Sequence, residues 1–266
     1  MGSGSAAMMQ ADGIDVTEDA FLGGALMMLQ PRDGYRAGVD AVLLAAATPV
    51  RQGRADSVLD AGSGVGVVGL CVAARVPDAQ VTLVENGPEL AALANQNVAR
   101  NGLGDRAKVI EADITSPARA LEEKGLSADS FTHVVANPPF HTEGHGRPSR
   151  NAIKARAHAM PAGDLAHWVR FAARVTQPGG SLTIVHRADA AGELLTLMEG
   201  RFGALRLLPI HPRDGSAAVR VLLQGRKGSR APLTILPGLI LHNDDNSFRP
   251  NVADILRHGA LLDLGC

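Results

Sequence analysis

The sequence has few residues that could form a disulfide or hold a metal ion. It contains two cysteines, Cys71 and Cys266, and they show none of the short spacings that zinc sites need. Disulfides also belong to oxidising compartments, where proteins that depend on them carry more cysteines. We therefore predict no metal site, no disulfide and a location in the reducing cytoplasm.

Long apolar runs and a strong net charge are also missing. The apolar stretch 41–47 is too short to cross a bilayer. The first ten residues, MGSGSAAMMQ, lack the basic region and apolar run of an export signal. A formal net charge of −1 argues against a general nucleic-acid coat protein but is compatible with a local basic patch. No membrane segment is expected.

The order of the apolar segments predicts the fold. From residue 57 onward, short apolar segments alternate with helical ones, which indicates an α/β, doubly wound, mostly parallel sheet. The last two segments lie too close in sequence for a helical crossover, so they should pair antiparallel as an edge hairpin. The seven predicted strands are 57–61, 80–85, 107–113, 131–137, 181–187, 204–210 and 217–225.

We predict one domain with two terminal segments, because 45% hydrophobic residues in a chain of this length can bury one core. Residues 1–15 are expected to be disordered. The domain covers residues 16–230 and opens with a helical lead-in, the run AVLLAAATPV. Residues 231–266 are expected to pack on the domain, as an extra strand or as a cover for the sheet edge.

The segment DAGSGVGVVG, residues 60–69, matches two kinds of ligand-binding loop. Counted from Gly64 it is G-x-G-x-x-G, a dinucleotide fingerprint; with Gly62 as the first glycine it is D-x-G-x-G-x-G, an S-adenosylmethionine (SAM) loop. Asp60 favours SAM, because a buried carboxylate repels a pyrophosphate but attracts the ammonium and sulfonium of SAM. The glycines let the backbone approach the cofactor.

The strand predicted over 131–137 ends in NPPF, residues 137–140. Two consecutive prolines remove two donors and fix the backbone, so the carbonyl of Pro138 can face a ligand. This carbonyl and the Asn137 side-chain oxygen could accept both protons of an exocyclic amine and free the nitrogen lone pair. Phe140 would stack on the ring that carries the amine. The motif predicts a catalytic site made of Asn137, Pro138, Pro139 and Phe140.

The combination of LDAGSGVG, LVE, EADI and NPPF resembles the SAM-dependent methyltransferases that modify amino groups. The segments YRAGVDAVLLAAATPV and VHRAD make the chain most similar, from about Tyr35 to Gly225, to the bacterial tRNA1(Val) adenine-N6 methyltransferase family. This resemblance implies a Rossmann-like methyltransferase fold, SAM as cofactor and tRNA as partner. It implies SAM binding by Asp40, Asp60, Gly62, Gly64, Gly66, Glu85, Asn86, Asp113 and Ile114.

The resemblance also implies a role for each of these residues. Asp60 and the glycines would wrap the amino-acid end of SAM, and Glu85 would hold the ribose. Asp113 would bind the adenine amine. Asp40 would cover the cofactor, although an N-cap of the following helix explains it equally well.

The residue at position 140 leaves the target of the reaction open. Adenine-N6 and glutamine enzymes usually carry Tyr there, and NPPFH is close to the motif of guanine-N2 rRNA methyltransferases. A guanine-N2 rRNA enzyme and a protein glutamine-N5 methyltransferase are therefore alternatives. An alternative without catalysis is a SAM- or RNA-binding module, and an NAD-dependent dehydrogenase is a further one.

The segment after NPPF is basic, with no acidic residue between Glu143 and Asp164. Next to an amine-activating motif, it could hold phosphates while a base is extruded into the pocket. Its histidines have no carboxylate or thiol to complete a metal site. The candidate substrate-binding residues are Arg147, Arg150, Lys154 and Arg156.

The single tryptophan belongs to a predicted helix. Trp168 has helical spacing with Leu165 and Ala172 in DLAHWVRFAARV. We expect it in the core rather than as a stacking surface for a ligand.

Overall fold

The computed structural model describes residues 9–11, 14–33, 36–140 and 164–265. Its strands are β1 (Met9–Ala11), β2 (Ile14–Phe21), β3 (Leu26–Pro31), β4 (Ser57–Ala61), β5 (Gln80–Glu85), β6 (Ala107–Glu111), β7 (Phe131–Ala136), β8 (Thr176–Arg187), β9 (Phe202–His211), β10 (Arg220–Lys227), β11 (Thr234–Ile235) and β12 (Leu239–Ile240). Its α-helices are α1 (Val39–Ala47), α2 (Val67–Arg75), α3 (Pro88–Arg100), α4 (Ala118–Glu123), α6 (Asp164–Val175), α7 (Ala191–Met198) and α8 (Pro250–His258).

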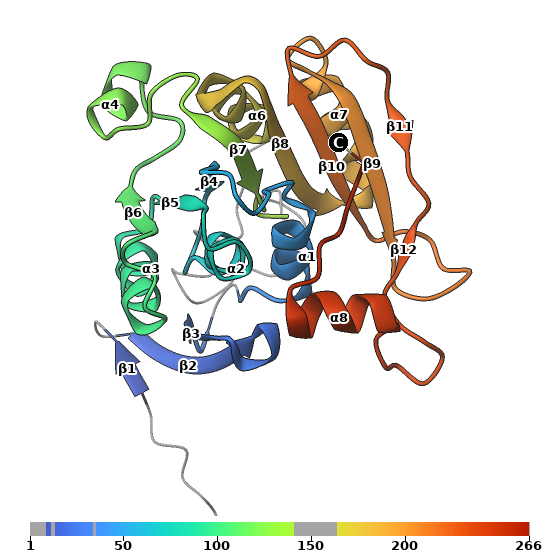
Figure 1. The fold of residues 1–266 in the computed structure, drawn as a ribbon, viewed down its shortest axis with the longest axis horizontal. Helices are drawn as coiled ribbons and strands as arrows, with labels where there is room; N and C mark the ends of the chain where they lie inside the picture. The colour runs from blue at the N-terminus through green and yellow to red at the C-terminus, as the bar shows by residue number, and fades with distance from the viewer. Residues whose placement is uncertain (1–8, 12–13, 34–35, 141–163, 266) are drawn as a thin grey trace, which may run out of the picture.

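The central sheet confirms the predicted fold class (Figure 1). Within the described ranges it has nine strands in the order β11-β9-β10-β8-β7-β4-β5-β6, with β12 also paired to β9. The strands β6, β5, β4, β7 and β8 are parallel. The strand β10 runs antiparallel to both β8 and β9, as the close spacing of the last two segments predicted. The two-residue strands β11 and β12 add to the predicted set of seven.

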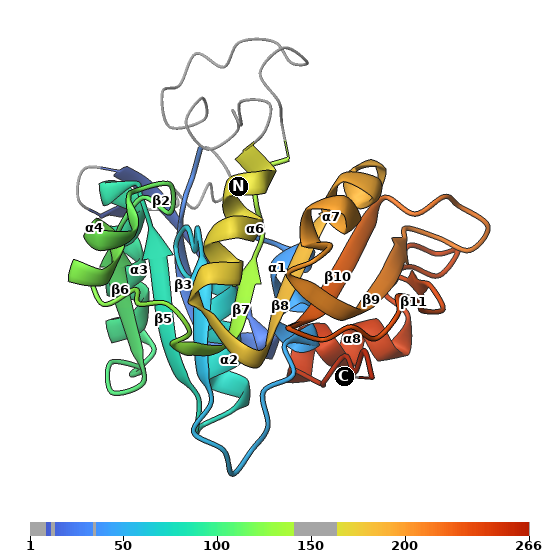
Figure 2. The ribbon, with the colours of Figure 1, turned by 90° about the horizontal axis from the view of Figure 1, so that it is seen from above.

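Helices cover both faces of the sheet and bury an apolar core on each. On one face α1, α2 and α3 pack together, and Leu43, Leu70 and Leu93 have no exposed surface. Figure 2 looks onto the other face, which α6 and α7 cover. Their buried side chains include Val169 and Leu194. Burying one such leucine stabilises the fold by roughly 1.5–3 kcal/mol. The two layers hold the strand ends rigidly.

The N-terminal segment differs from the prediction. Residues 9–11 and 14–15, which we expected to be disordered, belong to β1 and β2. The predicted helical lead-in is α1, but an antiparallel sheet of β1, β2 and β3 precedes it. This sheet forms because Val16, Leu26 and Met28 bury their side chains in the core.

Two asparagines on α3 hydrogen-bond to the backbone of β3 at the edge where a neighbouring strand would otherwise pair. The Asn97 side chain accepts from the Leu29 N–H at 2.7 Å and donates to its carbonyl at 3.0 Å. Asn101 binds Met27 in the same way, at 2.9 and 3.0 Å. One turn of helix separates the two side chains, so they satisfy alternate backbone groups of an otherwise open edge. Asn97 also donates to the Val65 carbonyl and so ties β3 to the loop before α2.

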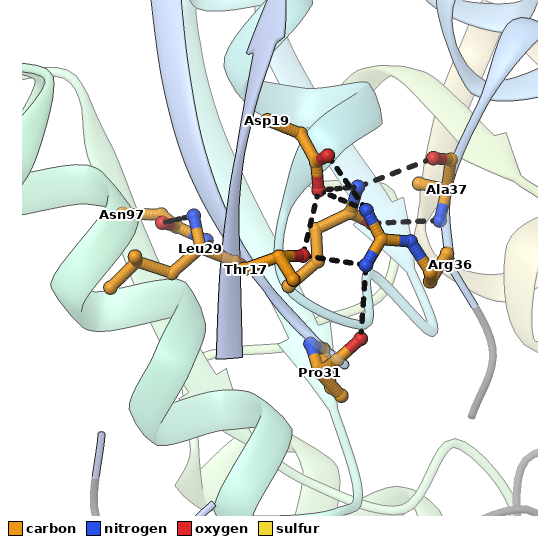
Figure 3. A network of polar contacts seen from close by, with 8 residues as sticks. Thr17, Asp19, Leu29, Pro31, Arg36, Ala37 and Asn97 are labelled. Atoms are coloured by element: carbon orange, nitrogen blue, oxygen red, sulfur yellow. Dashed lines mark hydrogen bonds and ion pairs between the residues drawn. The ribbon is translucent and has the colours of Figure 1, made fainter. Parts of the chain in front are cut away.

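A polar network fixes the segment just before α1 (Figure 3). The Arg36 guanidinium donates to both carboxylate oxygens of Asp19, at 2.7 and 2.5 Å, and also to Thr17. The Gln30 side chain accepts from the Ala37 N–H at 2.8 Å. These contacts hold the start of α1 against the β2–β3 hairpin.

The residues after 231 lie along the edge of the sheet. The strands β11 and β12 pair parallel with β9. Helix α8 packs against α1, and the Leu262 N–H donates to the Ala46 carbonyl at 3.0 Å. The open edge of β9 is thus partly paired.

A buried polar cluster lies at the amino end of β4. The Nδ1 of His133 is 2.8 Å from the Ser181 hydroxyl, and its Nε2 is 3.6 Å from the Asp56 carboxylate. Asp56 also accepts the Arg51 N–H at 3.3 Å. Burial lowers the pKa of His133. We call Asp56, His133 and Ser181 the amino-end cluster.

Candidate functional site

The register of the sheet brings the predicted site residues to one edge. Ala61 of β4 pairs with Val84 of β5 and with Ala136 of β7. The residues that follow these three positions are Gly62, Glu85 and Asn137. The predicted SAM loop, the predicted ribose acid and the predicted catalytic tetrapeptide therefore begin side by side. This edge is the carboxyl end of the parallel strands, where open α/β sheets bind ligands.

The loop between β4 and α2 needs glycine for its shape. Gly62, Gly64 and Gly66 have φ values of +60°, +56° and +91°, in the left-handed region that other residues avoid. A Cβ on Gly62 would also collide with the ring of Trp168, whereas a Cβ on Gly64 would meet nothing within 4 Å. The loop is closely packed at Gly62 and open at Gly64.

Trp168 was predicted to lie in the core, and the structure adds a contact between its ring and the glycine loop. It packs against the core beneath α6, as its helical spacing suggested, but it is only partly buried. The rest of its ring lies on Gly62. Trp168 forms one wall of the loop.

Glu85 holds the same loop from β5. One carboxylate oxygen accepts the Gly64 N–H at 2.8 Å and the other accepts the Gly87 N–H at 2.8 Å. The loop backbone adds a bond from the Ser63 N–H to the Val84 carbonyl at 2.9 Å. Glu85 thus lies within reach of any group bound over Gly64.

Asp60 is buried beneath the loop, with 1% of its surface exposed. Its carboxylate accepts the Gly69 N–H of α2 at 2.9 Å. Burial raises the pKa of Asp60 to about 7, the Gly69 bond opposes this rise, and the nearby charge of Glu85 adds to it. A positive charge bound over the loop would favour the ionised form of Asp60.

The loop fits the SAM that the sequence predicted. The Ser63 hydroxyl is buried and has no hydrogen-bond partner within the described ranges, so it can bind a polar group of a ligand. There is open space over Gly64, and two carboxylates, Asp60 and Glu85, lie close to the loop. SAM has a zwitterionic amino-acid end, a sulfonium and ribose hydroxyls that such a donor and acceptor set can hold.

The remaining predicted cofactor residues surround this edge. Glu85 pairs with Glu111 of β6, so Asp113 lies two residues beyond the end of that pairing. The exposed Asp113 accepts the N–H and the hydroxyl of Thr115, at 2.8 and 2.7 Å. Asn86 is exposed, and Ile114 is partly buried against the core.

The tetrapeptide continues from β7, with Pro138 buried and Asn137 and Phe140 partly buried. Among the described residues, His186 and Arg220 contact the Phe140 ring. The His186 ring is 5.2 Å from it at an interplanar angle of 89°. The Arg220 guanidinium lies over it, 4.6 Å from the ring centre.

Asp40 contacts this second group of residues. Its carboxylate accepts the Arg220 Nε–H at 2.9 Å. Sequence reasoning selected Asp40 but missed Arg220, which is 180 positions away and belongs to no motif. His186 lies in the VHRAD segment, which gave the only sequence signal for it.

The four predicted substrate-binding residues, Arg147, Arg150, Lys154 and Arg156, lie outside the described residues. In the part of the chain that the structure describes, no three His, Cys, Asp or Glu side chains are grouped as metal ligands. None of the described helices is long and apolar enough to cross a membrane.

The fold and the site together define a SAM-dependent methyltransferase of Rossmann-like topology. The model of the methyltransferase small domain family matches residues 38–211, and the chain belongs to that family. The match spans α1, the glycine loop, the tetrapeptide and the strands through β9.

The chain is similar to tRNA-modifying enzymes and to a solved methyltransferase structure. The tRNA1(Val) (adenine(37)-N6)-methyltransferase of Erwinia tasmaniensis is 32% identical over 72% of this chain and 75% of its own length. Its counterpart in Tolumonas auensis is 28% identical over 83% of this chain and 88% of its own length. A solved structure of a predicted O-methyltransferase from Agrobacterium tumefaciens is 34% identical, with a TM-score of 0.72, and covers 85% of this chain and 100% of its own.

Proposed function

We propose that the protein methylates the N6 amine of an adenine in tRNA, with SAM as the methyl donor. The names of the relatives from Erwinia and Tolumonas support this substrate. The observation that carries the proposal is the register that sets Asn137 level with Gly62 and Glu85, since it brings an amine-activating motif next to a SAM loop. A tRNA substrate would place the enzyme in the cytoplasm.

Asn137 and Pro138 would act on the amine. Bound SAM supplies an electrophilic methyl group on its sulfonium. The Asn137 side-chain oxygen and the Pro138 carbonyl would accept the two amine protons, so that the lone pair becomes available for attack. Phe140 would stack on the base and keep its amine in the plane of these acceptors.

Each cofactor residue would bind a different part of SAM along this edge of the sheet. Asp60 would attract the positive groups of SAM, Glu85 would bind the ribose hydroxyls, and Asp113 would bind the adenine amine. Asn86 and Ile114 would line the same pocket, and Gly62, Gly64 and Gly66 would admit the amino-acid end. The basic residues Arg147, Arg150, Lys154 and Arg156 would hold phosphates of the RNA.

The Agrobacterium structure is described as a predicted O-methyltransferase, and a hydroxyl acceptor needs a base to remove its proton. His186 is the histidine in contact with the Phe140 ring. Burial and the charges of Arg187 and Arg220 lower its pKa to about 4, which makes it a weak base at neutral pH. This favours an amine, because an amine lone pair can attack the methyl group first and the methylated nitrogen can then release one proton to solvent.

The test is methylation of tRNA from a strain that lacks the gene. We would incubate the purified protein with labelled SAM and this tRNA, and identify the labelled nucleoside by mass spectrometry. The proposal expects N6-methyladenosine. The same incubation is run in parallel with rRNA and with protein from the deletion strain. N2-methylguanosine in rRNA would transfer the assignment to the guanine alternative, and label in protein but not in RNA would transfer it to the glutamine alternative.

A further inference from the structure

Side chains from β10 and β8 contact the ring of Phe140, which follows β7. Arg220 is the first residue of β10, and its guanidinium lies 4.6 Å from the ring centre. His186 lies near the end of β8, with its ring perpendicular to that of Phe140 at 5.2 Å. His186 pairs with Val221, the neighbour of Arg220, so the two side chains leave opposite faces of the sheet within one residue of each other, at the end where Phe140 lies.

Arg220 is itself fixed at two points. Its Nε–H donates to Asp40 of α1 at 2.9 Å, and its Nη1 donates to the Val219 carbonyl at 3.0 Å. A planar guanidinium held through Nε has a fixed plane, which a lysine ammonium would lack. The polar network around Arg36 in turn anchors the start of α1, on which Asp40 lies.

His186 lies beside the backbone of the same segment. It is 8% exposed, and the nearby carbonyl of Pro139 partly opposes the lowering of its pKa. Its Nδ1 has no hydrogen-bond partner within the described ranges. Since the imidazole is neutral at physiological pH, it has a single N–H, which can face this carbonyl.

We infer that Arg220, oriented by Asp40, and His186 form a bracket that sets the geometry of the Asn137–Phe140 tetrapeptide. Arg220 and His186 are positioning residues, and Asp40 acts through Arg220. This inference rests on the proposed amine methylation and adds residues to its site.

The bracket matters because the tetrapeptide activates the amine only when its hydrogen-bond acceptors are correctly placed. Its amino end is fixed by β7, where Ala136 pairs with Ala61 and Ile184. Its carboxyl end is held by the contacts of Phe140 with His186 and with Arg220. A displacement of about 1 Å in a catalytic group can reduce the rate by about 10²-fold.

This assignment gives Asp40 a different role from the one that the sequence suggested. If Asp40 covers the cofactor, its removal should weaken SAM binding. If it acts through Arg220, its removal should lower turnover and leave SAM affinity unchanged.

The test compares Arg220→Ala, Arg220→Lys, Asp40→Ala and the Asp40→Ala/Arg220→Ala double variant. The control is Arg226→Ala, because Arg226 lies on the same strand but donates to Gly179, away from the tetrapeptide. We expect kcat to fall about 10- to 100-fold in Arg220→Ala. Arg220→Lys should not restore it, and the double variant should lose no more than Arg220→Ala.

SAM affinity and thermal stability are measured in parallel, with fluorescence of Trp168, the one tryptophan, as the binding signal. The Kd for SAM should change less than twofold in all variants. A weaker Kd in Asp40→Ala alone, or additive losses of kcat in the double variant, would overturn the coupling of Asp40 to Arg220. Normal kcat in Arg220→Ala would overturn the bracket.

Total RNA from the deletion strain serves as methyl acceptor. A product other than N6-methyladenosine would reject the proposed function, but the kcat values of the variants could still be compared. A second measurement needs no acceptor. The six phenylalanines are labelled with 4-fluorophenylalanine, and the Phe140 resonance is identified with Phe140→Leu. It should shift in Arg220→Ala and not in Arg226→Ala; an unchanged Phe140 resonance rejects the bracket whatever the substrate is.

Discussion

The two ends of the central sheet carry similar residues in different settings. At the amino end, Asp56, His133 and Ser181 are linked by contacts of 3.6 and 2.8 Å, an order that resembles a hydrolase triad. At the carboxyl end, Asp60 and Glu85 lie beneath and beside an open loop. Both ends hold buried acids.

The difference between the ends lies in what the polar groups can still bind. In the amino-end cluster Ser181 and Asp56 are 6% and 4% exposed, and each contacts His133. At the carboxyl end the Ser63 hydroxyl and His186 Nδ1 are buried with no partner in the described part of the chain. The amino-end triad is thus a structural cluster, because its groups bind one another, whereas Ser63 and His186 at the carboxyl end have polar atoms that can still bind a ligand.

The largest effect that separates the two ends is expected from Asn137→Ala. Loss of one acceptor for the amine protons should reduce kcat by about 10²-fold or more, by analogy with other transition-state hydrogen bonds. SAM affinity should fall little. Methyl transfer from labelled SAM to tRNA gives kcat, and Trp168 fluorescence gives the Kd.

Ser181→Ala is the matched change at the amino end. It removes a hydrogen bond from His133 and should cost about 1–2 kcal/mol of unfolding free energy, with kcat unchanged. If Ser181→Ala lost activity as strongly as Asn137→Ala, the amino-end cluster would have to be considered catalytic.

The next largest effect concerns the basic residues after the tetrapeptide. If Arg147, Arg150, Lys154 and Arg156 contact phosphates, a quadruple Ala variant should raise the KM for RNA by about 10-fold or more and flatten the salt dependence of binding, because each lost contact removes nearly one released counterion. A matched variant at a distance is Arg54→Ala, which pairs with Asp56. Parallel salt slopes in wild type and quadruple variant would contradict phosphate contacts and favour a protein substrate.

The sequence predicts the central sheet well because each strand carries its own signal. The strands over 57–61 and 80–85 have the predicted bounds, since their apolar runs end at the residues that leave the sheet. The hairpin of β2 and β3 was missed. Its stability depends on the side chains of Asn97 and Asn101, about 70 positions away, which no local pattern reveals.

The candidate site was predictable where residues are adjacent in sequence and hidden where they are not. Gly62 to Gly66 and Asn137 to Phe140 form contiguous motifs. The contact of Asp40 with Arg220 joins α1 to β10 across most of the chain. Trp168 shows a third case, because helical spacing predicts its burial but not the loop that it covers.

A smaller effect is expected from Gly62→Ala. Its φ of +60° disfavours any other residue by roughly 1–2 kcal/mol, and the added Cβ must displace Trp168. We expect SAM affinity to fall about tenfold, with modest loss of stability, because a side chain can move. At the amino end, the Cβ of Gly180→Ala would lie 2.6 Å from the Thr132 carbonyl oxygen, which cannot move without disturbing the sheet.

Thermal unfolding and SAM titration of the two glycine variants therefore test whether the carboxyl end of the sheet binds the ligand while the amino end supports the fold. Gly180→Ala should lower Tm more than Gly62→Ala and leave the SAM affinity of the folded fraction intact. The opposite pattern would mean that the loop around Gly62 supports the fold rather than the ligand.

The raised pKa of Asp60 also makes a prediction for stability. Below its ordinary value of 3.8 the carboxyl is neutral in both folded and unfolded protein, and the contribution of this group is fully present. Between pH 3.8 and about 7 the unfolded protein ionises this carboxyl while the folded protein keeps it protonated, so up to about 4 kcal/mol is lost progressively until the folded carboxyl ionises as well. Urea unfolding between pH 4 and 7 should show a weaker decline in Asp60→Asn.

The smallest effect at neutral pH is expected for SAM binding to Asp60→Asn. Because the pKa of Asp60 is about 7, its carboxyl is half protonated at that pH, and replacing it should weaken binding only several-fold. Ionised Asp60 attracts the positive groups of SAM, so wild-type affinity should rise several-fold from pH 5.5 to 7, as calorimetry can measure, while the affinity of Asp60→Asn stays flat. Asp56→Asn removes a buried carboxylate at the other end of β4 and should keep the wild-type pH dependence. If Asp56→Asn flattened it as well, the dependence would reflect the net charge of the sheet rather than a carboxylate under the loop, and the electrostatic distinction between the two ends would be lost.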